Sequence, residues 1–136
     1  MDKKPILYSF RRCPYAMRAR IFILLCEIEV QLREVQLRDI PREMINISPK
    51  ATVPVLQLND GTVLEESLDI MNWATDYKDK YNLKKSKLSN INIHNEILNK
   101  FDNDFKFHLD RYKYNNRYDL SEGVKEKDTH RDEALK

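Results

Sequence analysis

Short apolar segments alternate with amphipathic ones in the first half of the chain, which predicts a mixed α/β fold. Residues 6–8 follow Pro5 and predict a short buried strand. Residues 30–36 alternate apolar and polar side chains, as a half-buried strand does. Residues 53–58 and 62–64 predict a third and a fourth strand, and the Asp60-Gly61 pair between them favours a tight turn with positive φ.

Two amphipathic helices are predicted among these strands. The first follows Pro14 and presents one apolar face, formed by Met17, Ile21, Leu24, Leu25 and Ile28. The second opens at residues 65–67 and runs to about Asp79, with the apolar residues Leu68, Ile70, Met71, Trp73 and Ala74. A short irregular or helical stretch at 41–47 precedes the third strand. The predicted order is β-α-β-α-β-β-α, in which a helical crossover makes the first two strands parallel and the hairpin makes the last two antiparallel.

The second half of the chain predicts helices. Residues 78–87 are rich in lysine and lack apolar periodicity, so we expect a solvated connection. Beyond them, residues 88–109 predict a long helix. Its apolar residues cover a wide arc of the helix surface, so we expect other parts of a protein to bury it on two sides. Asp128 is expected to cap a last helix over 129–136, which has no stop signal, so the chain looks cut short. We therefore predict an α/β domain at 1–80, a linker at 81–87 and a partial all-α domain at 88–136.

Cys13 lies where the first strand turns into the first helix. Pro14 suits the first helical position, since its fixed φ fits there and its missing N–H would have no helical partner, and this makes Cys13 the N-cap. The N–H groups of a first helical turn and nearby cations favour the thiolate, the nucleophilic form of cysteine. Arg11, Arg12 and Arg18 supply those cations. The alternative is a structural cysteine that packs as a small apolar side chain.

Cys26 lies in the same predicted helix, near its apolar face, and we expect it to be structural. A rise of about 1.5 Å per residue separates it from Cys13 by roughly 20 Å, which exceeds the ~7 Å limit for a disulfide. Ala16 stands where a Cys-x-x-Cys pair would have its second cysteine. Redox chemistry here is therefore expected to use one thiol, with an external thiol resolving the mixed disulfide.

The amino-acid composition argues against several classes of protein. The 136 residues include 41% apolar and 34% charged residues with a net charge of +2, which is typical of a soluble globular protein. The sequence shows no membrane span and no signal peptide, so we expect no membrane partner. Two cysteines without an export signal indicate a reducing cytoplasm. The two glycines are too few for a glycine-rich nucleotide loop.

Two further groups of residues carry weak functional signals. His94, His108 and His130 lack metal-ligand spacing, so we expect helix-surface positions and no metal site. Arg111, Lys113 and Arg117 are interleaved with tyrosines, but the nearly balanced charge of the chain disfavours nucleic acid as a partner.

Three stretches in register resemble one known family. Residues 8–16 contain Arg-Cys-Pro-Tyr-Ala, residues 48–56 contain Val-Pro-Val-Leu, and residues 60–70 contain Glu-Glu-Ser-Leu-Asp-Ile. Together they are similar to the glutathione transferase superfamily, in its cysteine-type glutaredoxin-like and omega-like branches. The resemblance covers residues 1 to about 80 and implies a thioredoxin-like domain. Residues 105–114 are more weakly similar to the start of the helical second domain of bacterial members.

The resemblance implies roles for the residues around the cysteine, and each role has a simpler alternative. Pro54 matches a cis-proline that would turn the Val53 backbone towards glutathione as an added strand; the alternative is a trans proline at a strand edge. Pro14 and Tyr15 would shape the pocket rim, although Tyr15 could equally serve packing.

The two ends of glutathione would be held by charged and polar groups. Ser67 and the helix N–H groups would bind the γ-glutamyl carboxylate, and Glu66 would accept from the γ-glutamyl ammonium; the alternative is a plain helix-capping pair. Lys50 would neutralise the glycyl carboxylate, unless it is a solvated turn lysine.

The resemblance implies a glutathione-dependent thiol transferase that works through a Cys13–glutathione mixed disulfide. Its partners would be glutathione and an unidentified electrophile or disulfide. The alternative is a binding or regulatory module that keeps the fold without turnover and contacts a protein partner. In either case the apolar surface of the long helix requires a partner surface that covers it, and we therefore predict a homodimer.

Overall fold

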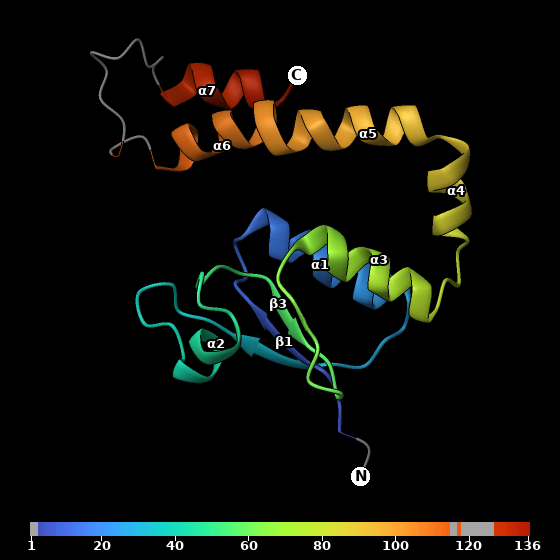
Figure 1. Cartoon of the computed structure of the whole chain (residues 1–136). Helices are drawn as coiled ribbons and strands as arrows, with labels where there is room; N and C mark the ends of the chain where they lie inside the picture. The colour runs from blue at the N-terminus through green and yellow to red at the C-terminus, as the bar shows by residue number, and fades with distance from the viewer. Residues whose placement is uncertain (1–2, 115–116, 118–126) are drawn as a thin grey trace. The chain divides into compact units, whose positions relative to one another are not determined.

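The computed structural model describes residues 3–114, 117 and 127–136. They form two compact units, Met1–Ser86 and Lys87–Lys136. Figure 1 shows a small sheet covered by helices in the first unit and helical ribbons in the second.

The sheet of the first unit has four strands in the order β2-β1-β3-β4. Their bounds are Ile6–Ser9 for β1, Gln31–Glu34 for β2, Val55–Gln57 for β3 and Val63–Leu64 for β4. β1 pairs with β2 in parallel, whereas β3 is antiparallel to both β1 and β4, so the topology predicted from the sequence is confirmed. The hairpin turn is the expected one: Gly61 has a φ of 90°.

Neighbouring strand residues supply the cores on opposite faces of the sheet. Leu7 and Leu56 are cross-strand partners and pack against α1 (Pro14–Leu25) and α3 (Ser67–Tyr77), through Ala19, Ile23 and Ile70. The next pair in register, Tyr8 and Val55, packs with Val35 and with Met44 of α2 (Arg42–Ile47). The sheet therefore separates two hydrophobic cores, one under α1 and α3 and one under α2 (Figure 1).

The buried face of α1 differs from the predicted one. Met17, Ile21 and Leu24 were expected to face the core, but they are 41%, 53% and 75% exposed, and Leu25 is exposed as well. The buried residues of α1 are Ala16, Ala19 and Ile23. The helix is apolar on two faces, and the face with two alanines allows the closer approach to α3 and the sheet.

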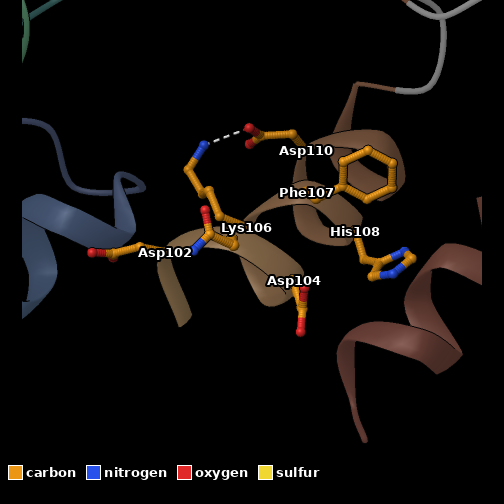
Figure 2. Close-up of a pocket in the computed structure, with 7 residues that line it drawn as sticks. Asp102, Asp104, Lys106, Phe107, His108 and Asp110 are labelled. Atoms are coloured by element: carbon orange, nitrogen blue, oxygen red, sulfur yellow. Dashed lines mark hydrogen bonds and ion pairs between the residues drawn. The ribbon is translucent and has the colours of Figure 1, made fainter. Parts of the chain in front are cut away.

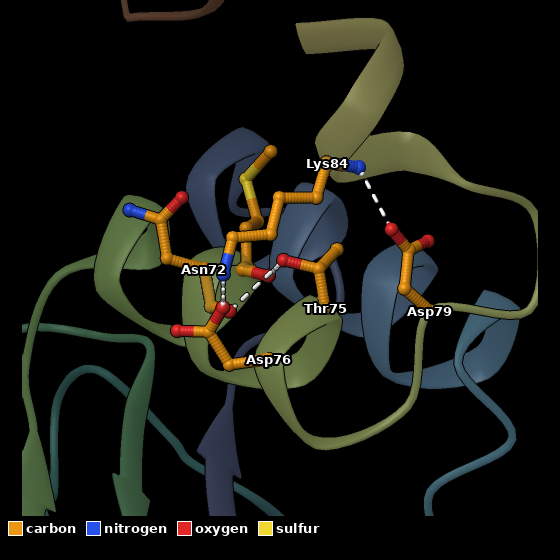
Figure 3. A network of polar contacts seen from close by, with 6 residues as sticks. Asn72, Thr75, Asp76, Asp79 and Lys84 are labelled. Atoms are coloured by element: carbon orange, nitrogen blue, oxygen red, sulfur yellow. Dashed lines mark hydrogen bonds and ion pairs between the residues drawn. The ribbon is translucent and has the colours of Figure 1, made fainter. Parts of the chain in front are cut away.

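The connection after α3 contains a helix, α4 (Leu83–Ser89), where the lysine-rich sequence gave no helical period. The Asp79 carboxylate accepts hydrogen bonds from the backbone N–H groups of Leu83 (2.7 Å) and Lys84 (2.9 Å), which satisfies donors of the first turn. The Lys84 ammonium in turn pairs with Asp76 near the end of α3 (Figure 3). Local polar contacts, rather than an apolar face, therefore start this helix.

The second unit contains one nearly continuous helical rod. α5 (Ile91–Lys100) continues through a π-helical turn, Phe101–Phe105, into α6 (Lys106–Lys113). The predicted helix over 88–109 is thus confirmed in kind, although it begins at Ile91 and runs further. α7 (Lys127–Ala134) packs on α6, and Asp128 lies in its first turn rather than at its N-cap.

The expectation that all three histidines lie on helix surfaces is wrong for His130. This side chain is 3% exposed, and its Nδ1 lies 2.8 Å from Nδ1 of His108 across the α6–α7 contact. Among the described residues of the second unit, it is the one fully buried side chain.

None of the helices in the described ranges combines the length and apolar character that a bilayer crossing requires.

A carboxylate joins the end of α1 to the segment after α3. Glu27 pairs with Lys78 at 2.7 Å and also with Lys80. Hydrogen bonds from these two ammonium groups lower the pKa of Glu27 from 4.5 to about 2. A pKa lowered by folding stabilises the folded chain above the unfolded value, and this contribution is lost as the pH falls through the folded value.

We therefore expect Glu27→Gln to lower the urea midpoint of unfolding at pH 7 in low salt. The effect should shrink as the pH falls from 4.5 to about 2, because the wild-type carboxylate then becomes neutral too. Fluorescence of Trp73, the single tryptophan, reports on unfolding. Glu29→Gln, which removes a pair with Lys4 alone, is the matched control and should have a smaller effect. An equal shift at pH 7 and pH 2 would contradict the assignment.

Candidate functional site

Cys13 occupies the N-cap of α1, as the sequence predicted, with Pro14 at the first helical position. Its backbone N–H donates to the Phe10 carbonyl (3.1 Å), which closes the turn after β1. Its side chain makes no capping hydrogen bond. The thiol is partly buried and donates instead to the Val53 carbonyl, with Sγ and O 3.7 Å apart. The Cys13 sulfur is thus held at the helix N-terminus beside a second backbone segment.

That second segment carries the predicted cis peptide bond. The Val53–Pro54 bond is cis, and Pro54 is buried where the chain enters β3. Because β3 is antiparallel to β1, its start lies beside the end of β1, where the turn to Cys13 begins. The structure therefore brings Cys13, Val53 and Pro54 together.

The start of α3 forms the second part of the site. Ser67 is the first residue of α3, follows Glu66 at the N-cap and is 3% exposed. Its hydroxyl accepts a hydrogen bond from Arg18 Nε at 2.8 Å, and the Arg18 guanidinium lies 4.9 Å from the centre of the Tyr15 ring. Arg18 was expected to act as a cation near the Cys13 thiolate, and in the structure it contacts Ser67 and Tyr15. Arg11 and Arg12, the other two predicted cations, are exposed in the turn before Cys13.

Two contacts join the loop before β3 to the loop before α3. The hydroxyl group of the buried Ser48 donates a hydrogen bond to Glu65 Oε1 (2.5 Å). Two residues further along, Lys50 forms an ion pair with Glu66. A cation and an anion that were both predicted to bind glutathione thus lie in direct contact with each other.

Sequence reasoning missed Arg20. Its guanidinium donates to Ser9 Oγ (2.6 Å), to the Phe10 carbonyl (3.2 Å) and to the Arg11 carbonyl (3.1 Å). One side chain of α1 therefore holds the turn that precedes Cys13. One signal in the sequence could have indicated this role. Arg20 is a charged residue that lies between Ala19 and Ile23, which both belong to the buried face of α1.

The two cysteines differ in environment, as predicted. Cys26 is 0% exposed, and burial together with the Asp79 carboxylate raises the pKa of its thiol. A raised pKa keeps this thiol protonated and unreactive. Cys13 is the accessible thiol of the pair.

The arrangement offers polar and charged partners to a small peptide beside the Cys13 sulfur. The Val53 carbonyl contacts Cys13, while Arg18 contacts Ser67 and Lys50 pairs with Glu66 at the start of α3. Within the described residues, no group of three or more His, Cys, Asp or Glu side chains has the geometry of a metal site.

Two pockets lined by described residues contain neither Cys13 nor Ser67. One is lined by Lys3, Trp73 and Tyr77 among others, beside the start of β1 and so at the opposite end of that strand from Cys13. The other belongs to the second unit, where Asp102, Asp104, Phe107 and His108 surround it beside the Lys106–Asp110 ion pair (Figure 2). Neither contains a residue predicted for the site.

Comparison with known proteins matches the first unit to one family. The family described as "Glutathione S-transferase, N-terminal domain" matches residues 7–79, more than half of the chain. Glutaredoxin 2 of Escherichia coli (strain K12) is 34% identical over 68 residues, which cover 50% of this chain and 31% of that protein. A probable glutathione transferase of Aplysia californica is 40% identical over 55 residues, which cover 40% of this chain and 60% of that protein. The chain thus matches about a third of one curated relative and three-fifths of the other.

Solved structures share the fold at low sequence identity. Glutathione transferase Omega 3C from Trametes versicolor has a TM-score of 0.74 at 18% identity, covering 98% of this chain and 58% of that one. A glutathione transferase homologue from Sulfitobacter, solved with bound glutathione, has a TM-score of 0.62 at 14% identity. The match covers 98% of this chain and 63% of that one.

The loop that carries Lys50 contains a strained backbone position. Ala51 has a φ of 54°, in the left-handed region that disfavours a Cβ atom by about 1–2 kcal/mol. Ala51→Gly removes that Cβ, and the greater freedom of glycine in the unfolded chain offsets about 0.5–1 kcal/mol of the gain. We expect the substitution to raise the free energy of unfolding by about 0.5–1 kcal/mol in urea titrations. Ala51→Ser keeps a Cβ and should bring no gain; a glycine variant less stable than wild type would contradict the argument.

Proposed function

Because the chain belongs to the glutathione S-transferase family, we propose that it is a glutathione-dependent thiol transferase that works through Cys13. The observation that carries the proposal is the position of the Cys13 sulfur, at the N-terminus of α1 and 3.7 Å from the Val53 carbonyl. The thiolate of an accessible cysteine is the attacking group in disulfide exchange. The branches that use tyrosine or serine instead activate the sulfur of glutathione itself.

Glutathione would lie along residues 53–54, with its cysteinyl backbone paired to Val53 as an added strand. Its γ-glutamyl carboxylate would meet the Ser67 hydroxyl, the N–H groups at the start of α3 and the Arg18 guanidinium, which already contacts Ser67 at 2.8 Å. Glu66 would accept from the γ-glutamyl ammonium. Pro14 and Tyr15 would form the rim beside the sulfur.

The exchange proceeds in two steps that balance without an outside oxidant. The Cys13 thiolate attacks the glutathione sulfur of a mixed disulfide, a Cys13–glutathione disulfide forms, and the other sulfur leaves as a thiolate. A second glutathione thiolate then attacks the Cys13-bound glutathione, which yields glutathione disulfide and the free Cys13 thiolate. A reducing compartment such as the cytoplasm supplies the reduced glutathione for this second step.

We expect Cys13→Ser to abolish exchange, because a hydroxyl at this position is not ionised and cannot attack a disulfide. Wild-type protein exposed to glutathione disulfide should gain one adduct on Cys13 by intact mass, and excess reduced glutathione should remove it. Cys26→Ser is the matched control and should keep the adduct, since that thiol is 0% exposed. Turnover retained in the Cys13→Ser variant would overturn the mechanism.

We also propose that the chain forms a homodimer. Apolar side chains on α5 are exposed, with Ile91, Ile93 and Ile97 at 39%, 58% and 62%, and an apolar surface of this kind favours association. Sedimentation velocity should show a dimer, and Ile97→Glu should shift it towards monomer. A stable, soluble wild-type monomer at all concentrations would count against the dimer.

A further inference from the structure

Two imidazole rings face each other where α7 packs on α6 (Figure 1). Nδ1 of His130 lies 2.8 Å from Nδ1 of His108, the ring centres are 5.1 Å apart, and His130 is 3% exposed. The contact belongs to the second unit alone, so an inference from it is independent of the proposed function. We propose that this pair is a pH switch, which holds α7 on α6 near neutral pH and releases it as the pH falls below about 6.5.

A contact between two Nδ1 atoms requires one proton between them. A neutral imidazole carries a hydrogen on one ring nitrogen and a lone pair on the other. One ring of the pair therefore donates its Nδ1–H, and the other accepts at Nδ1 and carries its own hydrogen on Nε2. When the donor ring also gains a proton on Nε2, the contact persists as a charge-assisted hydrogen bond. The neutral and the singly protonated pair are thus both compatible with the packed position of α7.

A second proton removes the acceptor. Both Nδ1 atoms would then carry a hydrogen, and the two hydrogens would meet within the 2.8 Å that separates the nitrogens. Two positive rings would also lie 5.1 Å apart, with His130 shielded from water, where like charges repel more strongly than in solvent. The doubly protonated pair is therefore incompatible with the packed position of α7.

The docking of α7 depends on His130 more than on its other described residues. The ring of His130 contacts His108 and lies 6.1 Å from the ring of Phe107, which is itself 5.0 Å from the His108 ring. The other residues of α7 whose burial is described are half-buried or exposed. Loss of the His130 contact therefore removes the most buried contribution of α7 to the unit.

Charged side chains of both signs lie on the elements packed around the pair. Within the described ranges they are Asp102 and Asp104 on the π-helical turn, Lys106, Asp110, Arg111 and Lys113 on α6, and Arg131, Asp132 and Glu133 on α7. Lys106 already pairs with Asp110, Arg131 with Asp132, and the Arg111 guanidinium lies 3.5 Å from the centre of the Phe107 ring. Cations and carboxylates thus occur together, and they do not cancel the repulsion between two imidazolium rings in contact.

The direction of the pH effect follows from the number of protons bound. A histidine in contact with water takes up a proton as the pH falls through about 6.5. With α7 released, both rings can do so, whereas the docked pair gains one proton at most. The form that binds more protons is favoured in acid, and each additional proton shifts the equilibrium by about tenfold per pH unit.

Hydrogen–deuterium exchange of the whole chain measures the docking of α7. Protection of the α7 backbone amides is followed from pH 8 to pH 5 by mass spectrometry and corrected for the intrinsic pH dependence of exchange, with EDTA in every buffer to remove metal ions. Protection in α7 should be constant above about pH 7 and should fall by about tenfold between pH 6 and pH 5. Protection in α3, which contains no histidine, should stay constant and reports on the first unit.

The variant His108→Asn keeps an acceptor at this position but removes the second titrating ring. The amide oxygen of asparagine accepts a hydrogen bond at every pH in this range, so both neutral and protonated His130 can donate to it. Protection of α7 should be within about threefold of wild type at pH 8 and about tenfold above wild type at pH 5. His94→Asn is the matched control, because it makes the same change on α5, outside the pair, and should follow wild type at every pH.

Three results would exclude the switch. One is wild-type protection of α7 that stays constant from pH 8 to pH 5. Another is a His108→Asn variant whose α7 loses protection as the wild type does, which would show that a different group titrates. The third is a His108→Asn variant whose α7 is unprotected already at pH 8, because an acceptor at this position should be sufficient for docking.

The histidine Hε1 signals of the wild-type protein, followed by NMR over the same pH range, give a second readout that needs no variant. Uptake of the second proton by His108 and His130 should coincide with the loss of α7 protection. A pair that takes up both protons while α7 stays protected would contradict the inference.

Discussion

The antiparallel pairing of β1 with β3 is the constraint on which the candidate site depends. Tyr8 pairs with Val55 and Leu7 with Leu56, so the end of β1 lies beside the start of β3. The turn that follows β1 leads to Cys13, and the segment that precedes β3 contains Val53 and Pro54. A slip of one residue in this register would turn Leu7 and Tyr8 to the wrong faces, and the two separate cores therefore fix it.

Local sequence signals were sufficient to predict most of the strands and helices of the first unit. Short apolar runs and one alternating segment predicted the strands, and Pro14 placed the start of α1 with Cys13 at its N-cap. The Asp60-Gly61 pair gave the hairpin, in which Gly61 has the positive φ that the turn requires. These features are set by residues close in sequence, which is why they can be predicted without tertiary contacts.

Features that depend on distant residues could not be predicted in the same way. α1 is apolar on two faces, and only its packing against α3 selects the face with Ala16 and Ala19. The hydrogen bond from Arg18 to Ser67 joins residues that are 49 positions apart, so no local pattern indicates it. The contact between His108 and His130 joins residues that are 22 positions apart in the second unit, so the periodicity of the sequence does not indicate it either.

The three hydrogen bonds of Arg20 have an energetic consequence for the segment that carries Cys13. A free loop of this kind would lose conformational entropy when a ligand orders it, and that loss would weaken binding. Here the Phe10 and Arg11 carbonyls and the Ser9 hydroxyl already have a donor in the folded chain. The entropy of the turn is therefore lost during folding, and the segment that carries Cys13 is already ordered before any ligand binds.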